Sequence, residues 1–229
     1  MTRESLKGVQ DESTYGGITS FMRRRYSRDL SGVDVAVLGV PFDLATTNRA
    51  GTRLGPRGIR TASASLSWEN QVQGWDFSPL EELAIVDYGD CPFDAGTPDK
   101  VPEQIYQQAR DILATDTALL SLGGDHFVSY PLLRAHAEKY GPLALIHFDA
   151  HSDTWEDDGP RIDHGTMFYH AAKEGLVVPE YSAQIGLRTY NESTMGFNIF
   201  DGPTVHDQGA VTIAQQVKRI VGDRPCYLT

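Results

Sequence analysis

Two aspartates and a histidine alternate in the segment Asp149-Ala150-His151-Ser152-Asp153, which directly follows the apolar run 143–148. If the chain stays extended there, Asp149, His151 and Asp153 share one face, because side chains alternate along a strand with a period of two. Carboxylates held this close repel each other when both are ionised, and a divalent cation removes that repulsion. The spacing therefore predicts a metal site. The alternative is a polar loop in which the aspartates cap turns.

Another histidine follows the preceding apolar run, 118–122, in the segment Gly123-Gly124-Asp125-His126. Paired glycines allow a sharp turn. Because the carboxyl ends of adjacent parallel strands share one crevice, we expect His126 to join the carboxylates. Imidazole and carboxylate donors without thiolates suit manganese, iron or nickel better than a structural zinc site. We interpret Asp125 as a turn or supporting residue, and His147 as a core histidine that could still reach the site.

Apolar runs of strand length must position these motifs, and several are almost continuously apolar, as buried parallel strands are. They cover residues 33–40, 83–86, 118–122, 143–148, 183–187 and 197–200. Helical patterns lie among them, over 102–113, over 131–140, and along an apolar stripe through Ile213, Val217 and Ile220 that ends near Gly222. This alternation predicts an α/β fold with three layers, α/β/α, around a mainly parallel sheet.

Length and composition bound the architecture. With 229 residues, 40% hydrophobic and 22% charged, the chain is globular and long enough for one good-sized core. We expect an N-terminal arm over 1–32 and a single domain over 33–229. The arm carries Arg23, Arg24, Arg25 and Arg28, which we interpret as a solvated basic face, with packing on a neighbouring subunit as the alternative.

Charge and apolar content exclude several classes of protein. A formal net charge of -11 argues against a nucleic-acid-binding surface and is compatible with a small cationic substrate. The N-terminus lacks the apolar stretch of a signal peptide, and no apolar run is long enough to span a bilayer, so we predict a cytoplasmic protein without a membrane partner. Cys91 and Cys226 cannot build a disulfide framework.

The motifs resemble those of the ureohydrolases, the arginase and agmatinase family. Segments 123–126 and 149–153 look like the first two signature motifs of that family, and segments 39–43 and 49–60 are similar to its early region. Two further segments look specifically like agmatinases, Asp163-His164-Gly165-Thr166-Met167-Phe168 and Gln184-Ile185-Gly186-Leu187-Arg188. The resemblance extends across nearly the whole chain, and it implies an arginase-like domain over residues 33–229.

The resemblance implies a site with two manganese ions, whose bridging hydroxide attacks a guanidinium carbon and releases urea. Nickel or iron would accept the same donors. By similarity, His126 and Asp153 serve mainly one ion, His151 serves the other, and Asp149 bridges them and takes part in catalysis. The implied reaction is agmatine hydrolysis to putrescine and urea, a step of polyamine biosynthesis, and the family also implies a homo-oligomer, commonly a trimer or hexamer.

Two more residues receive roles from the resemblance. His164 matches the family histidine that shuttles a proton to the leaving amine or positions substrate, a role that suits a group titrating near neutral pH. A turn histidine beside Gly165 is the alternative. Asn48 is expected to border the entrance and contact substrate. The loop 49–60 is interpreted as conformational, because its arginines would repel a cationic substrate.

The third family motif, a strand followed by several aspartates, is absent, and the chain stops in the strand-like segment 225–229. We therefore expect a chain truncated at its C-terminus, without the aspartates that complete the second metal site or the glutamate that binds guanidinium. If it is the whole protein, we predict no hydrolysis by the chain alone.

Alternative functions are a guanidinobutyrase or other guanidino-acid hydrolase, an arginase-like amide deacetylase, and an inactive structural or regulatory subunit in a mixed oligomer. Metal stoichiometry separates the enzymes from the inactive subunit.

Overall fold

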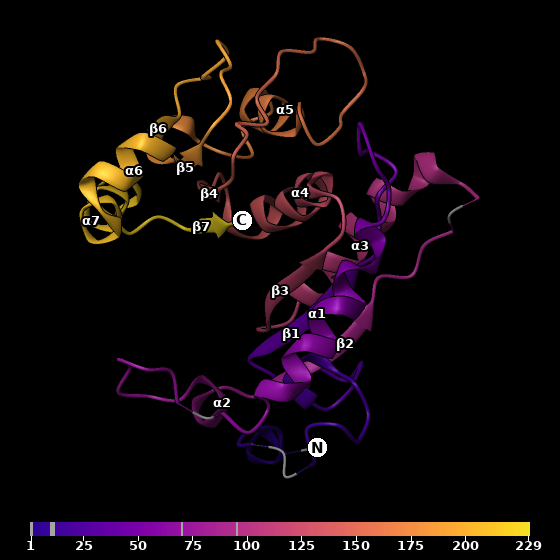
Figure 1. Cartoon of the computed structure of the whole chain (residues 1–229). Helices are drawn as coiled ribbons and strands as arrows, with labels where there is room; N and C mark the ends of the chain where they lie inside the picture. The colour runs from indigo at the N-terminus through magenta and orange to yellow at the C-terminus, as the bar shows by residue number, and fades with distance from the viewer. Residues whose placement is uncertain (1, 10–11, 70, 95) are drawn as a thin grey trace. The chain divides into compact units, whose positions relative to one another are not determined.

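The computed structural model describes residues 2–9, 12–69, 71–94 and 96–229, and the chain divides into two compact units, Met1–Val128 and Ser129–Thr229 (Figure 1). Each unit contains a parallel β-sheet with helices packed on it. The predicted division into an arm over 1–32 and one domain over 33–229 stays a prediction.

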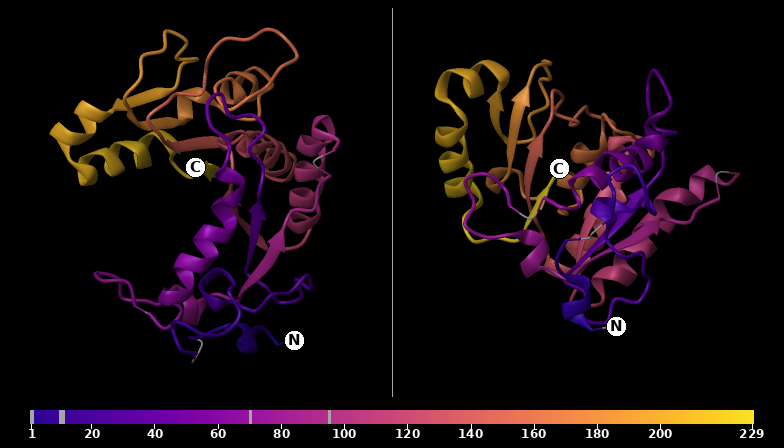
Figure 2. Two further views of the ribbon diagram at one scale, coloured as in Figure 1. Left: turned by 45° about the vertical axis from the view of Figure 1, so that its right-hand side comes forward. Right: turned by 60° about the horizontal axis from the view of Figure 1, so that its bottom comes forward.

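The first unit is built on a three-stranded sheet in the order β2-β1-β3. Its strands are β1 (Val35–Val40), β2 (Ile85–Asp90) and β3 (Ala118–Gly123), and all pairings are parallel. After its first residue, the central strand β1 is buried throughout, which explains its continuous apolar character. In the left view of Figure 2, α1 (Gly55–Ser63) lies to one side of these strands and α3 (Val101–Leu113) to the other.

The second unit is built on a four-stranded parallel sheet in the order β6-β5-β4-β7. The strands are β4 (Ala144–Phe148), β5 (Ala183–Leu187), β6 (Asn198–Asp201) and β7 (Cys226–Leu228). One face packs on α7 (Ala210–Val221) through a cluster that contains Ala144, Ile185, Phe200, Ile213 and Val217. Side chains of β4 alternate between the two faces of the sheet, and on the face opposite α7 His147 contacts Phe168 of α5 (Met167–Lys173). The sheet therefore has helices on both faces.

The predicted strands are confirmed, and most of their ends agree with the structure within one or two residues. The predicted helices α3, α4 (Ser129–Tyr140) and α7 are confirmed as well. Further helices were not expected: α1, α2 (Pro79–Glu82), α5 and α6 (Gly202–Gln208). Short 3₁₀ segments are η1 (Arg3–Leu6), η2 (Phe21–Arg23), η3 (Thr52–Leu54), η4 (Ala64–Leu66), η5 (Pro98–Lys100), η6 (His126–Val128) and η7 (Pro179–Tyr181).

Helix α1 escaped prediction because its buried side is not apolar. Its buried residues are Pro56, Arg60 and Ser63, which give no hydrophobic period. The Arg60 guanidinium instead donates to both carboxylate oxygens of Asp87, at 2.7 and 2.9 Å, and to Asp90 at 2.5 Å. Ion pairing therefore fastens this helix to strand β2.

The N-terminal arginines are not all solvated. Arg23 and Arg24 are 6% and 2% exposed. Arg23 Nη1 donates to Glu12 Oε2 at 2.7 Å, and Arg24 Nη1 donates to the Gly8 carbonyl at 2.6 Å. The interpretation of this cluster as a solvated basic face is wrong for these two residues, because the N-terminal segment itself supplies partners that cover them.

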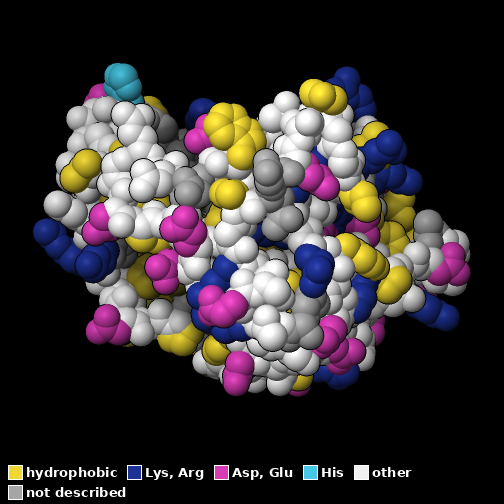
Figure 3. All heavy atoms as spheres, turned by 90° about the horizontal axis from the view of Figure 1, so that it is seen from below, with side chains coloured by type: hydrophobic (Ala, Val, Ile, Leu, Met, Phe, Trp, Pro, Cys, Tyr) yellow, Lys and Arg dark blue, Asp and Glu magenta, His cyan; other side chains and the backbone are white. Residues whose placement is uncertain are grey.

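The surface carries both signs of charge. Acidic, basic and apolar side chains are interspersed on the face drawn in Figure 3. Within the described ranges, no helix has the length and apolar character needed to cross a bilayer.

Candidate metal centre

Strand β4 delivers the acidic segment to the carboxyl edge of its sheet. Beyond the strand, the Asp149 backbone nitrogen donates to the Ile185 carbonyl at 3.2 Å, and the Ala150 carbonyl accepts from Arg188 N at 2.8 Å. These bonds hold the segment against the end of β5. Asp149 Oδ1 accepts from the His151 backbone nitrogen at 2.8 Å and lies 3.1 Å from His151 Nδ1.

The extended conformation assumed for residues 149–153 does not persist. Asp153 adopts a left-handed backbone with φ of 53°, and its carbonyl accepts from Phe168 N at 3.0 Å. The Asp153 side chain is buried by this turn. His151 instead keeps 61% of its side chain exposed, against 25% for Asp149. His151 therefore stays in contact with Asp149 at the surface, whereas Asp153 is buried.

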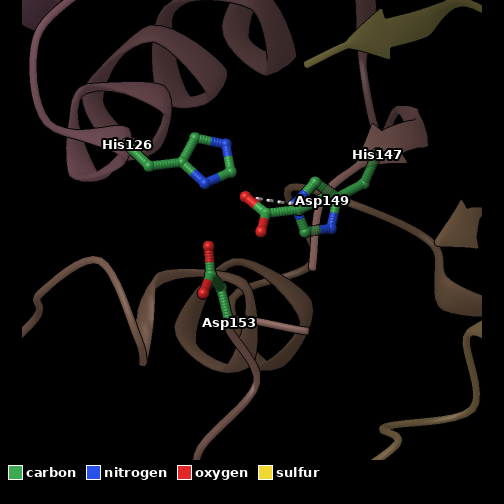
Figure 4. A group of neighbouring side chains, drawn as sticks. All are labelled: His126, His147, Asp149 and Asp153. Atoms are coloured by element: carbon green, nitrogen blue, oxygen red, sulfur yellow. Dashed lines mark ion pairs between the residues drawn. The ribbon is translucent and has the colours of Figure 1, made fainter. Parts of the chain in front are cut away.

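Four side chains come together at this edge, each offering one ligand atom, and these atoms all lie within 4.8 Å of one another (Figure 4). They belong to His126, His147, Asp149 and Asp153. His126 begins the 3₁₀ turn η6, which continues without a gap into α4 of the second unit. The group unites three of the predicted ligands, and it contains His147 in place of His151.

A glycine turn brings His126 to this position. Gly124 has φ of 41°, and a Cβ atom on it would lie 2.4 Å from the Phe42 carbonyl oxygen and 2.5 Å from that of Val40. Both the positive φ and these short distances to backbone oxygens exclude a side chain at position 124. Asp125 Oδ1 accepts from Phe127 N at 3.0 Å, so Asp125 shapes the turn as predicted.

His147 is fully buried, in agreement with its interpretation as a core histidine, and it also faces the carboxylates. Its Nδ1 lies 3.2 Å from Gln184 Nε2, and its Nε2 lies 3.7 Å from Asp149 Oδ2. Its ring meets Phe168 edge-on, with centroids 4.8 Å apart. The signal was available in the sequence, because His147 and Asp149 are two residues apart and share a strand face. The sequence gives Gln184 no role beyond its place in the segment 184–188.

The two predicted substrate residues lie outside this group. His164 is partly buried in the turn before α5, where Asp163 Oδ1 accepts from Gly165 N at 3.0 Å. Asn48 is exposed in the loop that follows β1 in the first unit. Their roles stay predictions.

The chemistry of the donor set suits a cation. Two carboxylates with ligand atoms this close are costly to keep ionised without a positive charge between them. Imidazole and carboxylate donors without a thiolate match borderline and hard divalent ions such as Mn²⁺, Fe²⁺ and Ni²⁺. The residues present therefore fit a divalent metal.

Comparison with known proteins supports the same chemistry. The sequence model of the Arginase family matches residues 33–229. An agmatinase from Chromobacterium violaceum is 55% identical over 229 residues, which cover 99% of this chain and 71% of the relative. An agmatinase from Photorhabdus laumondii is 44% identical over 100% of this chain and 75% of its own length.

Solved structures match as well. A hypothetical agmatinase from Burkholderia thailandensis superposes with a TM-score of 0.94 at 53% identity, over 97% of this chain and 70% of that one. Proclavaminate amidino hydrolase from Streptomyces clavuligerus superposes with a TM-score of 0.84 at 33% identity, over 95% and 74%. The predicted fold class, a three-layer α/β/α architecture of the arginase type, is confirmed.

Proposed function

The chain belongs to the arginase family, and on that premise we propose that it hydrolyses agmatine to putrescine and urea. It is a ureohydrolase-type enzyme. One observation carries the choice of agmatine, namely 55% identity to an agmatinase over 99% of the chain. The group of His126, His147, Asp149 and Asp153 supports it, because ureohydrolysis needs an activated water and these residues fit a metal that activates one.

The family fold together with this His and Asp group indicates a binuclear metal site. We propose manganese for both ions, held by His126, Asp149, Asp153 and His151. The exposed imidazole of His151 is tied to Asp149 at 3.1 Å, which keeps it at the rim of the group as a ligand for the second ion. When bound, the ions lower the pKa of water and so supply a nucleophile at neutral pH.

The substrate determines what the protein residues must do. A guanidinium is cationic and delocalised at neutral pH, so it resists attack by water. Asp149 and Asp153 offset part of the charge of the ions and so reduce its repulsion of this cation. The carbon–nitrogen bond to the alkyl amine breaks as the water oxygen is added, and the departing nitrogen needs a proton. His164 delivers that proton in our proposal, because an imidazole can carry a proton and donate it to a leaving group.

The test is a direct assay of urea and putrescine from agmatine, with protein loaded with Mn²⁺ and with the bound metal measured on the same sample. Asp149→Asn is expected to lower kcat/KM more than about 100-fold, because loss of even a supporting group costs about 10- to 100-fold. Asp207→Asn makes the same chemical change at an exposed position of α6 and serves as the control. Absence of hydrolysis in protein that holds two ions per chain would refute the proposal.

The same assay separates the alternatives. A guanidino-acid hydrolase is favoured by the likeness to proclavaminate amidino hydrolase, and it would turn over 4-guanidinobutyrate faster than agmatine. An inactive structural subunit would hold one ion or none and release no urea from either compound. A trimeric or hexameric homo-oligomer and a cytoplasmic location complete the proposal, and light scattering on the purified protein tests the oligomer.

A further inference from the structure

We propose that His147 is a positioning residue for Asp149 and not a metal ligand, and that Gln184 sets the orientation of its ring. The inference rests on the proposed function only in taking Asp149 as a metal ligand. It assigns roles within the four-residue group, in which His126, Asp149 and Asp153 bind metal and the fourth side chain orients one of them.

The orientation of the Gln184 amide is decided by a backbone carbonyl. Gln184 Nε2 lies 2.6 Å from the Ser152 carbonyl oxygen, which can only accept a hydrogen bond. A flipped amide would place two oxygens in contact there, so the nitrogen must face Ser152. Gln184 Oε1 has no hydrogen-bond partner among the described residues, which is consistent with an amide held by its nitrogen alone.

The second hydrogen of the same amide nitrogen is directed at His147, whose Nδ1 lies 3.2 Å away. Because Nδ1 accepts this hydrogen bond, its lone pair is occupied and the proton of the neutral ring resides on Nε2. A protonated ring nitrogen cannot bind a metal. Nε2–H instead faces Asp149 Oδ2, with a heavy-atom distance of 3.7 Å. Neither nitrogen of His147 is therefore available as a ligand.

The surroundings make this arrangement rigid. His147 and Gln184 are register partners on the adjacent parallel strands β4 and β5, and both are fully buried. The ring of Phe168 closes the other side of the imidazole. His151 N donates to Asp149 Oδ1 at 2.8 Å, and His147 Nε2 lies 3.7 Å from Oδ2, so the two oxygens of the carboxylate face different neighbours. Such outer groups orient a metal-binding carboxylate before the ion arrives.

A matched pair of substitutions at His147 tests the proposal. The amide nitrogen of glutamine can occupy the place of imidazole Nε2 and donate to Asp149, whereas that of asparagine takes the place of Nδ1 and cannot reach Asp149. We expect His147→Asn to weaken Mn²⁺ affinity by about 10- to 100-fold, and His147→Gln to weaken it by less than about tenfold. Competition with a metal-binding dye measures both, and circular dichroism confirms folding.

A second measurement addresses the ring directly and needs neither metal nor turnover. Nitrogen-15 NMR of histidine-labelled, metal-free protein should show His147, assigned by its loss in His147→Gln, with a protonated Nε2 and an unprotonated Nδ1. Gln184→Glu should reverse this pattern, because a carboxylate accepts a hydrogen bond from Nδ1–H. If Glu does not fold at this buried position, the wild-type spectrum alone decides the point.

Two results would overturn the positioning role: a wild-type ring protonated on Nδ1, or equal losses of metal affinity in His147→Asn and His147→Gln. Failure here is distinguishable from failure of the proposed function. If the protein hydrolyses agmatine but His147 is protonated on Nδ1, only the role of His147 is rejected. If His147 is protonated on Nε2 but the protein does not hydrolyse agmatine, only the proposed function is rejected.

Discussion

Asp43 should make the stability of this protein depend on pH in a way that one substitution removes. The residue lies beyond the end of β1 and is 2% exposed. Arg53 Nε donates to its Oδ1 at 2.7 Å, and the backbone nitrogens of Gly51 and Arg53 donate to its Oδ2 at 2.7 and 3.3 Å. These donors, with the Arg53 hydrogen bond contributing most, lower the pKa of Asp43 from 3.8 to about 2.

The magnitude follows from linkage between protonation and folding. The unfolded chain binds a proton to Asp43 more readily than the folded chain, so this contribution to stability increases with pH. It amounts to about 2 kcal/mol of the free energy of unfolding at pH 7, is fully present above about pH 4, and is lost as the pH falls through about 2. At pH 3 about 1 kcal/mol remains.

Urea unfolding of the wild type and of Asp43→Asn at pH 7, 5 and 3 tests this value. The difference in unfolding free energy between the two proteins should shrink by about 1 kcal/mol from pH 7 to pH 3. Asp207→Asn, an exposed carboxylate on α6, controls for the change in net charge and should show no such trend. A difference between wild type and Asp43→Asn that stays constant over this range would refute the reasoning. Direct titration of the Asp43 carboxyl carbon by NMR provides an independent check.

Three further predictions concern the first unit and the thiols. Arg60→Met should lower the free energy of unfolding by about 3–5 kcal/mol, because it leaves the buried Asp87 carboxylate uncompensated; a loss below about 1 kcal/mol in urea unfolding would contradict this. Ile105→Ala, which opens a cavity under α3, should cost about 2–5 kcal/mol, with the exposed Gln107→Ala as its control, and equal losses in the two variants would argue against it. Burial raises the pKa of Cys91 to about 12. A disulfide reagent at pH 8 should therefore modify only the exposed Cys226 in folded protein and both thiols after unfolding, and fast modification of Cys91 in the folded state would be the contrary result.

The hydrophobic period was sufficient to locate most of the fold. Continuous apolar runs become strands because both faces of a parallel sheet are covered, as β1 and β4 show. Local chemistry also predicted that Gly124 turns the chain and that Asp125 caps the turn, since both effects depend on neighbouring backbone. The expectation that the motifs after β3 and β4 meet assumed adjacent strands of one sheet. His126 does lie near Asp149 and Asp153, but β3 and β4 belong to different sheets, so that reason is wrong.

Long-range partners decided the rest. Helix α1 has a polar buried side, whose Arg60 is paired with Asp87 and Asp90 from a distant part of the sequence. His151 lies outside the group of four and stays exposed, although an extended chain would have placed it on one face with Asp149 and Asp153. His147 and Gln184 lie 37 residues apart, and only the parallel pairing of β4 with β5 places the amide against the ring. Residue spacing therefore determined which donors follow each strand, whereas tertiary packing determined the orientation of each donor, because hydrogen bonds between distant segments fix side-chain rotamers and ring tautomers.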